Sequence, residues 1–268
     1  MKLKTLAKRI LPARLSAEIS AYRWWRHLIA QNARDGNVEL TRRLIEQCGN
    51  AVVYGPFMGL RYPADILLSH CSTHNLLGTY EVEIHPWLER LLANRYECAV
   101  VIGCGEGYYA VGIALRTAMS VRAYDTCITV RRDCRRMAKV NRVSSRVHGS
   151  SWCGSRHLAK LQGMRCLVLS DCEGYEQNLF TPQTVPSLLH SDLLIELHDH
   201  GMPSGSMRGL LQARLQATHR VEVVSSRPRQ VSDFPHLAGL DPADAQRGID
   251  EGARGTVQQW MLATALRP

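Results

Sequence analysis

Three glycines at the end of an apolar run are the strongest chemical signal in the sequence. They lie in the turn Gly103-Cys104-Gly105-Glu106-Gly107, which follows the apolar residues 98–102. Glycine lets the backbone turn tightly and approach a ligand closely, and a helix after such a turn points free N–H groups outward. A dinucleotide site would carry a third glycine where Tyr108 stands. The pattern therefore favours a cofactor without a pyrophosphate, with a purely structural turn as the alternative.

An acid at the end of the next apolar segment supports this interpretation. Residues 120–125 read as a strand that ends at Asp125. A carboxylate at that place can accept hydrogen bonds from both ribose hydroxyls of an adenosine cofactor. The alternative is a strand-end aspartate that caps a helix.

Acids also gather after two later strands. Residues 166–171 and 192–199 read as strands; Asp171 ends the first of them and Glu173 follows it. Either acid could orient the substrate or the cofactor, or act as a general base on a hydroxyl; acids in the first turn of a helix are the alternative.

The fifth apolar run ends in Glu196, His198 and His200, which would share a face of a continued strand. With Asp171 they could hold a divalent metal, but their spacing matches no known metal motif. We therefore expect no metal, and a general base at His198 or Glu173, since an imidazole titrates near neutrality.

Strand-like and helix-like segments alternate from residue 98 to the end. The expected strands are 98–103, 120–125, 145–150, 166–171, 192–199, 220–226 and 257–264, with helices at about 107–118 and 128–141. This alternation predicts an α/β fold with a doubly wound, mostly parallel sheet, whose ligands bind at the carboxyl ends of the strands.

The first part of the chain has a different pattern. Residues 1–32 and 36–48 read as helices, with a break at Pro12; residues 51–63 read as a β-hairpin around Gly55-Pro56, and 80–94 as a helix. We expect a basic helical segment at 1–50, a hairpin and helix cap at 51–95, and the catalytic domain at 96–268.

Charge and composition exclude several classes of protein. Of a net charge of +9, residues 1–30 carry +6 (seven basic residues and one acid), so the main body is nearly neutral and nucleic-acid binding is not implied. The basic segment either packs on its own domain or makes a weak contact with a membrane surface or a partner. Nine cysteines without a CxxC pair indicate a reduced, cytoplasmic protein, and no apolar stretch is long enough to span a bilayer.

Several segments together resemble the FkbM-like branch of the class I methyltransferases. They are GPFMGLRYP (55–63), LLGTYEVEIHPWLERLL (76–92), VVIGCGEGYYAVGIAL (100–115), AYD (123–125), DCEGYE (171–176) and IELHD (195–199). The resemblance implies a seven-stranded Rossmann-like sheet with an antiparallel last strand and S-adenosylmethionine as methyl donor. It also implies O-methylation of a small hydroxylated acceptor such as a sugar or glycan precursor.

The resemblance also assigns roles to residues. The turn from Gly103 to Gly107, with Tyr108 at the start of the helix, would hold the methionine end. Asp125 would hold the ribose. Tyr80 and Glu81 would close over the cofactor, and Asp171 would lie near the methyl group.

One position departs from the class I pattern. Many class I enzymes have an acid two residues before the first glycine, where this chain has Val101. Glu106 is the candidate replacement. Two other functions stay open: a methyltransferase fold that binds without turnover, and a NAD-dependent oxidoreductase.

Overall fold

A computed structural model describes residues 13–199, 206–251 and 257–266. It begins with a long helix, α2 (Ala13–Arg34), followed by α3 (Asn37–Cys48). Both confirm the helices expected in the first 50 residues, while the expected segment before Pro12 lies outside the described residues. No helix in the described residues is long and apolar enough to cross a membrane.

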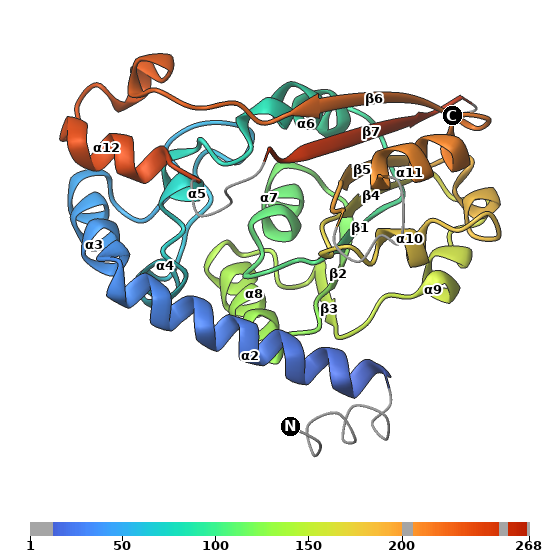
Figure 1. Ribbon diagram of the computed structural model, residues 1–268, viewed down its shortest axis with the longest axis horizontal. Coiled ribbons are helices and arrows are strands. Elements are labelled where there is room, and N and C mark those ends of the chain that lie inside the picture. The colour runs from blue at the N-terminus through green and yellow to red at the C-terminus, as the bar shows by residue number, and fades with distance from the viewer. Residues whose placement is uncertain (1–12, 200–205, 252–256, 267–268) are drawn as a thin grey trace.

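A seven-stranded sheet forms the centre of the molecule (Figure 1). Its strands are β1 (Cys98–Ile102), β2 (Ser120–Tyr124), β3 (Val147–Ser150), β4 (Cys166–Ser170), β5 (Asp192–Glu196), β6 (His219–Ser225) and β7 (Gln259–Ala265). The order across the sheet is β3-β2-β1-β4-β5-β7-β6. Strands β1 to β5 pair in parallel, and β7 runs antiparallel to β5 and β6. The doubly wound sheet and its antiparallel last strand are confirmed.

Helices cover both faces of the sheet, which explains why the central strands are apolar throughout. Because side chains alternate along a strand, Ala99 and Val101 pack in one core, and Val100 and Ile102 in the other. The first core lies under α6 (His85–Leu92), α7 (Tyr108–Arg116) and α8 (Ile128–Val140). The second lies under α9 (Ser155–Ala159), α10 (Glu176–Leu179) and α11 (Met207–Leu215).

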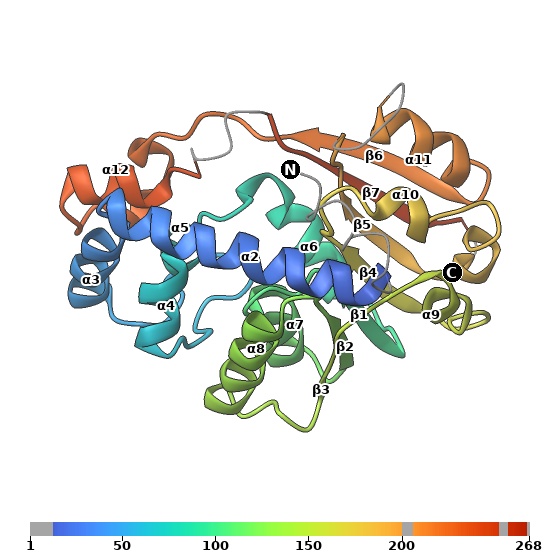
Figure 2. The ribbon, with the colours of Figure 1, turned by 60° about the horizontal axis from the view of Figure 1, so that its bottom comes forward.

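A helical cap adjoins the α7–α8 side of the sheet. It consists of α2, α3, α4 (Ala64–His70), α5 (Thr73–Leu77) and α12 (Pro242–Ile249), which both ribbon views place together (Figures 1 and 2). Late in the chain, α12 returns to pack against α3 and α5, where the Thr73 hydroxyl donates a hydrogen bond to the Gly248 carbonyl over 2.9 Å. The remaining elements are short 3-10 helices: η1 (Val82–Ile84), η2 (Val185–Leu188), η3 (Val231–Asp233) and η4 (Pro235–Leu237).

The predicted β-hairpin at residues 51–63 is wrong. The segment makes a single antiparallel bridge, between Ala51 and Arg61, and no pair of strands. Gly55 and Gly59 have positive φ angles and lie in two overlapping turns: Met58 donates its N–H to the Gly55 carbonyl, and Leu60 donates to the Phe57 carbonyl, each over 3.0 Å. Phe57 and Leu60 are therefore both fully buried instead of alternating between two faces.

Strand ends bring the predicted functional residues to one edge of the sheet. Ile102 of β1 stands in register with Tyr124 of β2 and Ser170 of β4, and Ser170 in turn with Ile195 of β5. The residues just after these positions form a row at the carboxyl edge. The fifth strand is shorter than predicted, since β5 ends at Glu196 and His198 lies beyond it.

Candidate functional site

The glycine turn has the tight, left-handed backbone that glycine adopts without strain. Gly103, Gly105 and Gly107 have φ angles of 81°, 51° and 111°. A Cβ at Gly103 would lie 1.5 Å from the Asp171 carbonyl oxygen, so the end of β4 packs directly against the turn. A Cβ at Gly105, by contrast, would meet no heavy atom of the described residues within 4 Å beyond its chain neighbours. The turn is therefore closed on the side of β4 and has open space at Gly105, where a ligand could approach.

Asp125 holds this turn in place. Its Oδ2 accepts a hydrogen bond from the Gly105 N–H over 3.0 Å, and its Oδ1 accepts one from the Cys127 N–H over 2.8 Å. Burial raises the pKa of Asp125, and these two N–H donors partly offset the effect. Each carboxylate oxygen has a second lone pair, and the residue stays partly exposed. Asp125 can thus support the turn and still accept hydrogen bonds from a ligand.

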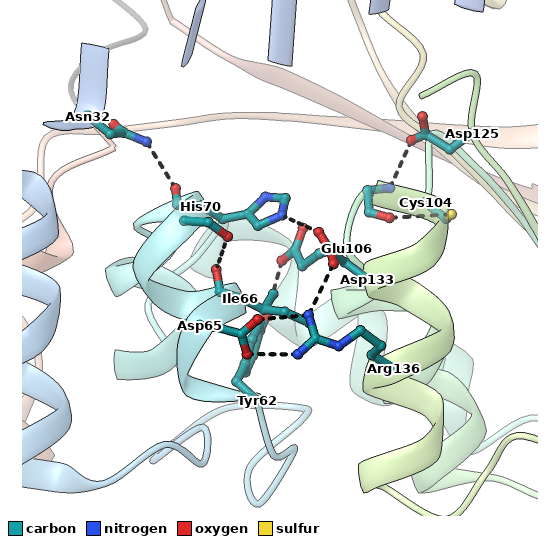
Figure 3. A network of polar contacts seen from close by, with 12 residues as sticks. Asn32, Tyr62, Asp65, Ile66, His70, Cys104, Glu106, Asp125, Asp133 and Arg136 are labelled. Atoms are coloured by element: carbon teal, nitrogen blue, oxygen red, sulfur yellow. Dashed lines mark hydrogen bonds and ion pairs between the residues drawn. The ribbon is translucent and has the colours of Figure 1, made fainter. Parts of the chain in front are cut away.

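The side chains of Cys104 and Glu106 point away from Asp125 into the protein (Figure 3). Cys104 is buried in the core that includes α7 and α8. The buried Tyr62 donates its hydroxyl to Glu106 Oε1 over 3.1 Å. A cofactor on the turn would therefore meet the backbone of Cys104, while Glu106 binds the cap in this structure.

An aromatic cluster begins where α7 leaves the turn. The ring of Tyr80 lies edge-on to that of Tyr108, with centroids 5.5 Å apart, and Tyr109 packs beside both. The buried carboxylate of Glu81 accepts a hydrogen bond from the Tyr109 hydroxyl. The structure thus brings together Tyr80, Glu81 and Tyr108, three of the residues predicted to enclose the cofactor.

The Tyr108 hydroxyl is buried without a hydrogen-bond partner among the described residues. Burial raises its pKa, and the negative charges of Glu81, Glu106 and Glu251 raise it further, so the group remains a neutral donor. A buried hydroxyl without a partner is costly. An acceptor on a bound ligand would remove that cost.

A second cluster surrounds His198, where β4 and β5 end. His198 Nδ1 lies 3.3 Å from Glu176 Oε1. On the other side of the ring, Nε2 lies 3.7 Å from Asp171 Oδ1, 3.7 Å from Glu173 Oε2 and 3.5 Å from Glu196 Oε2. We call these five residues the acidic cluster. Both residues predicted to be catalytic, Glu173 and His198, belong to it.

Burial differs strongly within the acidic cluster. The side chains of Glu176 and Glu196 are 0% and 1% exposed, whereas that of Glu173 is 70% exposed. Burial opposes the charge on His198, but the hydrogen bond that it donates to Glu176 and the charges of the nearby carboxylates raise its pKa overall. Burial likewise opposes ionisation of Glu176, while His198 and the Cys172 N–H lower its pKa. Glu176 and His198 therefore favour each other's charged form.

Sequence reasoning missed Glu176, although it belongs to the segment DCEGYE. The Cys172 N–H donates to Glu176 Oε1 over 2.9 Å, which closes the turn between β4 and α10. Its signal in the sequence was weak, because an acid in the first turn of a helix is ordinary. Glu176 gains its partner only in the folded protein, where His198, which follows β5, lies beside it.

Sequence reasoning also missed the pair His70–Asp133, which joins the cap to α8. His70 Nε2 lies 3.1 Å from Asp133 Oδ2, and both side chains are nearly buried (Figure 3). Most basic residues in and just after α8 are exposed (Arg132, Arg135, Arg136, Lys139 and Arg142), whereas Arg131 is half-buried and donates to the Asp125 and Thr126 carbonyls.

No protein-family profile and no curated protein sequence matches the chain. Several solved structures resemble parts of the chain at low identity. An O-methyltransferase from Bacillus cereus in complex with SAH is 12% identical, with a TM-score of 0.42 over 66% of this chain and 77% of that one. A putative O-methyltransferase from Klebsiella pneumoniae is 13% identical, with a TM-score of 0.40 over 67% and 76%. The precorrin 8W decarboxylase of Methanobacterium thermoautotrophicum is 15% identical, with a TM-score of 0.42 over 67% and 88%.

The order of the strands defines the fold class, independently of these likenesses. A sheet ordered β3-β2-β1-β4-β5-β7-β6 with an antiparallel β7 is the Rossmann-like fold of the class I methyltransferases. Its carboxyl edge carries two adjacent regions: a glycine turn with Asp125, and the acidic cluster. Fold alone does not determine function, so the functional argument rests on these two regions.

Proposed function

We propose that the chain is an S-adenosylmethionine-dependent methyltransferase that methylates a hydroxyl of a small acceptor, such as a sugar or glycan precursor. One observation carries the proposal: the partly exposed Asp125 carboxylate, bound to the Gly105 N–H, lies beside a turn with open space. A ligand at this place would meet a carboxylate for its ribose hydroxyls and, for its other end, the start of α7, whose first N–H groups have no partner within the helix.

The chain's residues fit an adenosine cofactor better than a dinucleotide. Tyr108 is buried at the start of α7 and packs against Phe57 and Tyr80. A dinucleotide turn needs a glycine at that place to bring helix, strand and pyrophosphate together. The buried Tyr108 hydroxyl also offers a donor that a bound cofactor could use.

The acidic cluster would serve the acceptor. S-adenosylmethionine supplies a methyl group that its sulfonium already activates. Asp171 would help to place the acceptor beside the turn, since its backbone contacts Gly103. Glu173, or His198 in its neutral form, would take the hydroxyl proton. The acceptor oxygen would bond to the methyl carbon in the same in-line step in which the carbon–sulfur bond breaks and leaves its electron pair on sulfur. The protein's main contribution is alignment of the two reactants.

Titration calorimetry with S-adenosylmethionine tests the proposal. We expect saturable binding to the intact chain, and at least about tenfold weaker binding to Asp125→Ala, a loss of ~1.4 kcal/mol. Glu222→Gln, on β6 and paired with Arg90, is the matched control and should bind as the unmodified chain does. Thermal unfolding of each variant would separate lost binding from lost structure.

Two outcomes would replace the proposal with its alternatives. Measurable NAD binding, with none for S-adenosylmethionine at millimolar concentration, would favour an oxidoreductase. Cofactor binding without S-adenosylhomocysteine release across a panel of hydroxylated acceptors would favour a binding module. Val101, in place of the acid found in many class I enzymes, is the feature that keeps this second outcome open.

A further inference from the structure

We propose that Asp171, Glu196 and His198 bind a divalent metal ion of the Mn²⁺ or Zn²⁺ type beside the cofactor turn. One ligand atom from each of the three residues lies within 4.8 Å of the other two. The site would replace the expectation, made from spacing in the sequence, that the chain holds no metal.

Distances in the acidic cluster suit such an ion. Two ligand atoms about 2.1 Å from one ion stand roughly 3.0–3.4 Å apart in tetrahedral or octahedral geometry. His198 Nε2 lies 3.5 Å from Glu196 Oε2 and 3.7 Å from Asp171 Oδ1. For these two pairs a contraction of a few tenths of an ångström reaches that range, while the ligand atoms of Asp171 and Glu196 lie within 4.8 Å of each other.

Glu176 supports His198 as a ligand. It accepts from Nδ1, which leaves Nε2 directed toward Asp171 and Glu196. A carboxylate on the far nitrogen of a histidine is the usual support for a metal-binding imidazole. The other oxygen of Glu176 is buried without a hydrogen-bond partner among the described residues. An ion bound at Nε2, across the ring, would make the imidazole a stronger donor to this buried carboxylate.

The charge of the acidic cluster favours a cation as well. Within the described part of the chain, no lysine or arginine forms an ion pair with Asp171, Glu173 or Glu176. Without an ion, one imidazolium supplies a single positive charge to these carboxylates; a divalent ion on Nε2 would displace the proton there and supply two. One nitrogen with two oxygens also suits Mn²⁺ or Zn²⁺ better than Mg²⁺, which prefers oxygen ligands.

The position of the ion suggests its role, which, unlike its binding, rests on the proposed function. Asp171 contacts the glycine turn through its backbone, so the ion would lie next to the cofactor. An ion there lowers the cost of removing a proton from an acceptor hydroxyl that reaches it. His198 would then be a ligand, and the exposed Glu173 would be left to take the proton.

Binding of Mn²⁺ alone to the chelator-treated chain tests the site, with electron paramagnetic resonance as the readout. We expect one bound ion per chain. Asp171→Asn and Glu196→Gln should each weaken binding by more than about tenfold, and Glu176→Gln, which acts through His198, by about 10–100-fold. Glu173→Gln should change affinity less than about threefold, because that carboxylate is mostly exposed, and Glu222→Gln should not change it.

Pulsed resonance distinguishes a built site from general attraction to acids. We expect a nitrogen coupling from His198 on the bound Mn²⁺, and its loss in His198→Ala. Bound Mn²⁺ without a nitrogen coupling, or no saturable binding to the intact chain at millimolar Mn²⁺, would overturn the proposal even if a variant failed to fold. Calorimetry with S-adenosylmethionine on the chelator-treated chain tests the proposed function separately. The metal site and the proposed function can therefore fail independently of each other.

Discussion

Two nearly buried histidines in this protein have opposite surroundings. His70, in the cap, faces Asp133, and that carboxylate also lies 3.6 Å from Arg136. His198, at the sheet edge, faces four carboxylates, two of which are completely or almost completely buried. The His70 site has basic groups to match its acid. The His198 site has one imidazole for an excess of acids.

This difference distinguishes buried polar groups that stabilise the fold from buried polar groups that serve a binding site. A matched buried pair is expensive to break but needs nothing from solution. An excess of acids at a strand edge destabilises the fold unless a ligand or ion compensates for it, which is typical of functional sites. The His70–Asp133 pair therefore joins the cap to α8, whereas the acidic cluster is arranged to receive another group.

The largest expected effect comes from breaking the matched pair. Asp133→Ala would leave His70 buried without its acceptor, and we expect the free energy of unfolding to fall by about 3 kcal/mol. Urea denaturation followed by circular dichroism measures the change.

Asp65→Ala is the control for that experiment. Asp65 belongs to the same network and pairs with Arg136 at 2.8 Å, but both side chains are largely exposed (Figure 3). Exposed ion pairs contribute little to stability. The free energy of unfolding should therefore fall much less in Asp65→Ala than in Asp133→Ala. Equal losses for the two variants would remove the distinction between the pairs.

A smaller effect of opposite sign is expected in the acidic cluster. In the presence of chelator, Asp171→Asn removes one of several like charges, and the free energy of unfolding should stay the same or rise by up to about 1 kcal/mol. The same denaturation experiment measures it. A clear loss of stability would mean that Asp171 is held for structure, and the contrast with Asp133 would disappear.

The smallest effect is a pH dependence of the cap. Burial opposes charge on His70, but Asp133, with Glu106 and Asp125 nearby, raises its pKa overall, while Arg136 pairs with the same Asp133. Because the pKa of His70 is higher in the folded protein than in the unfolded chain, protonation of His70 stabilises the fold. This contribution is complete below about pH 6.5, the ordinary histidine value, and is lost as the pH rises through the folded-state pKa.

Denaturation of the unmodified chain and of His70→Gln at pH 6 and pH 8 isolates this contribution. The unmodified chain should lose more stability at pH 8 than the variant does, because other groups titrate in both proteins. Identical pH dependence in the two would show that the pair does not contribute through protonation.

Periodicity in the sequence predicts the sheet well. Residues 98–102 and 166–170 are apolar because both faces of β1 and β4 are buried, so their pattern leaves little choice of structure. The turn at Gly103 follows from the end of β1, and the place of Asp125 from the end of β2. The hairpin fails because the apolar residues of 51–63 pack singly around turns, and a short apolar run cannot distinguish this from a strand.

Pairing between distant segments is what the sequence could not reveal. His198 and Glu176 come from different strand–helix connections, and neither has a spacing that specifies the other. His70 and Asp133 likewise meet only when the cap packs on α8. Such contacts depend on how helices and loops are placed over the sheet, which local patterns do not encode.

The close approach at Gly103 has a consequence for how this protein matures. Its missing side chain lets the carbonyl of Asp171 occupy the space where a Cβ would stand. A nascent chain that has made only β1 and β2 contains the whole glycine sequence but lacks the strand that gives the turn its final support. Completion of the turn therefore waits for β4. The pocket should become competent late in synthesis, and a truncated chain that ends before β4 should carry the motif without its binding capacity.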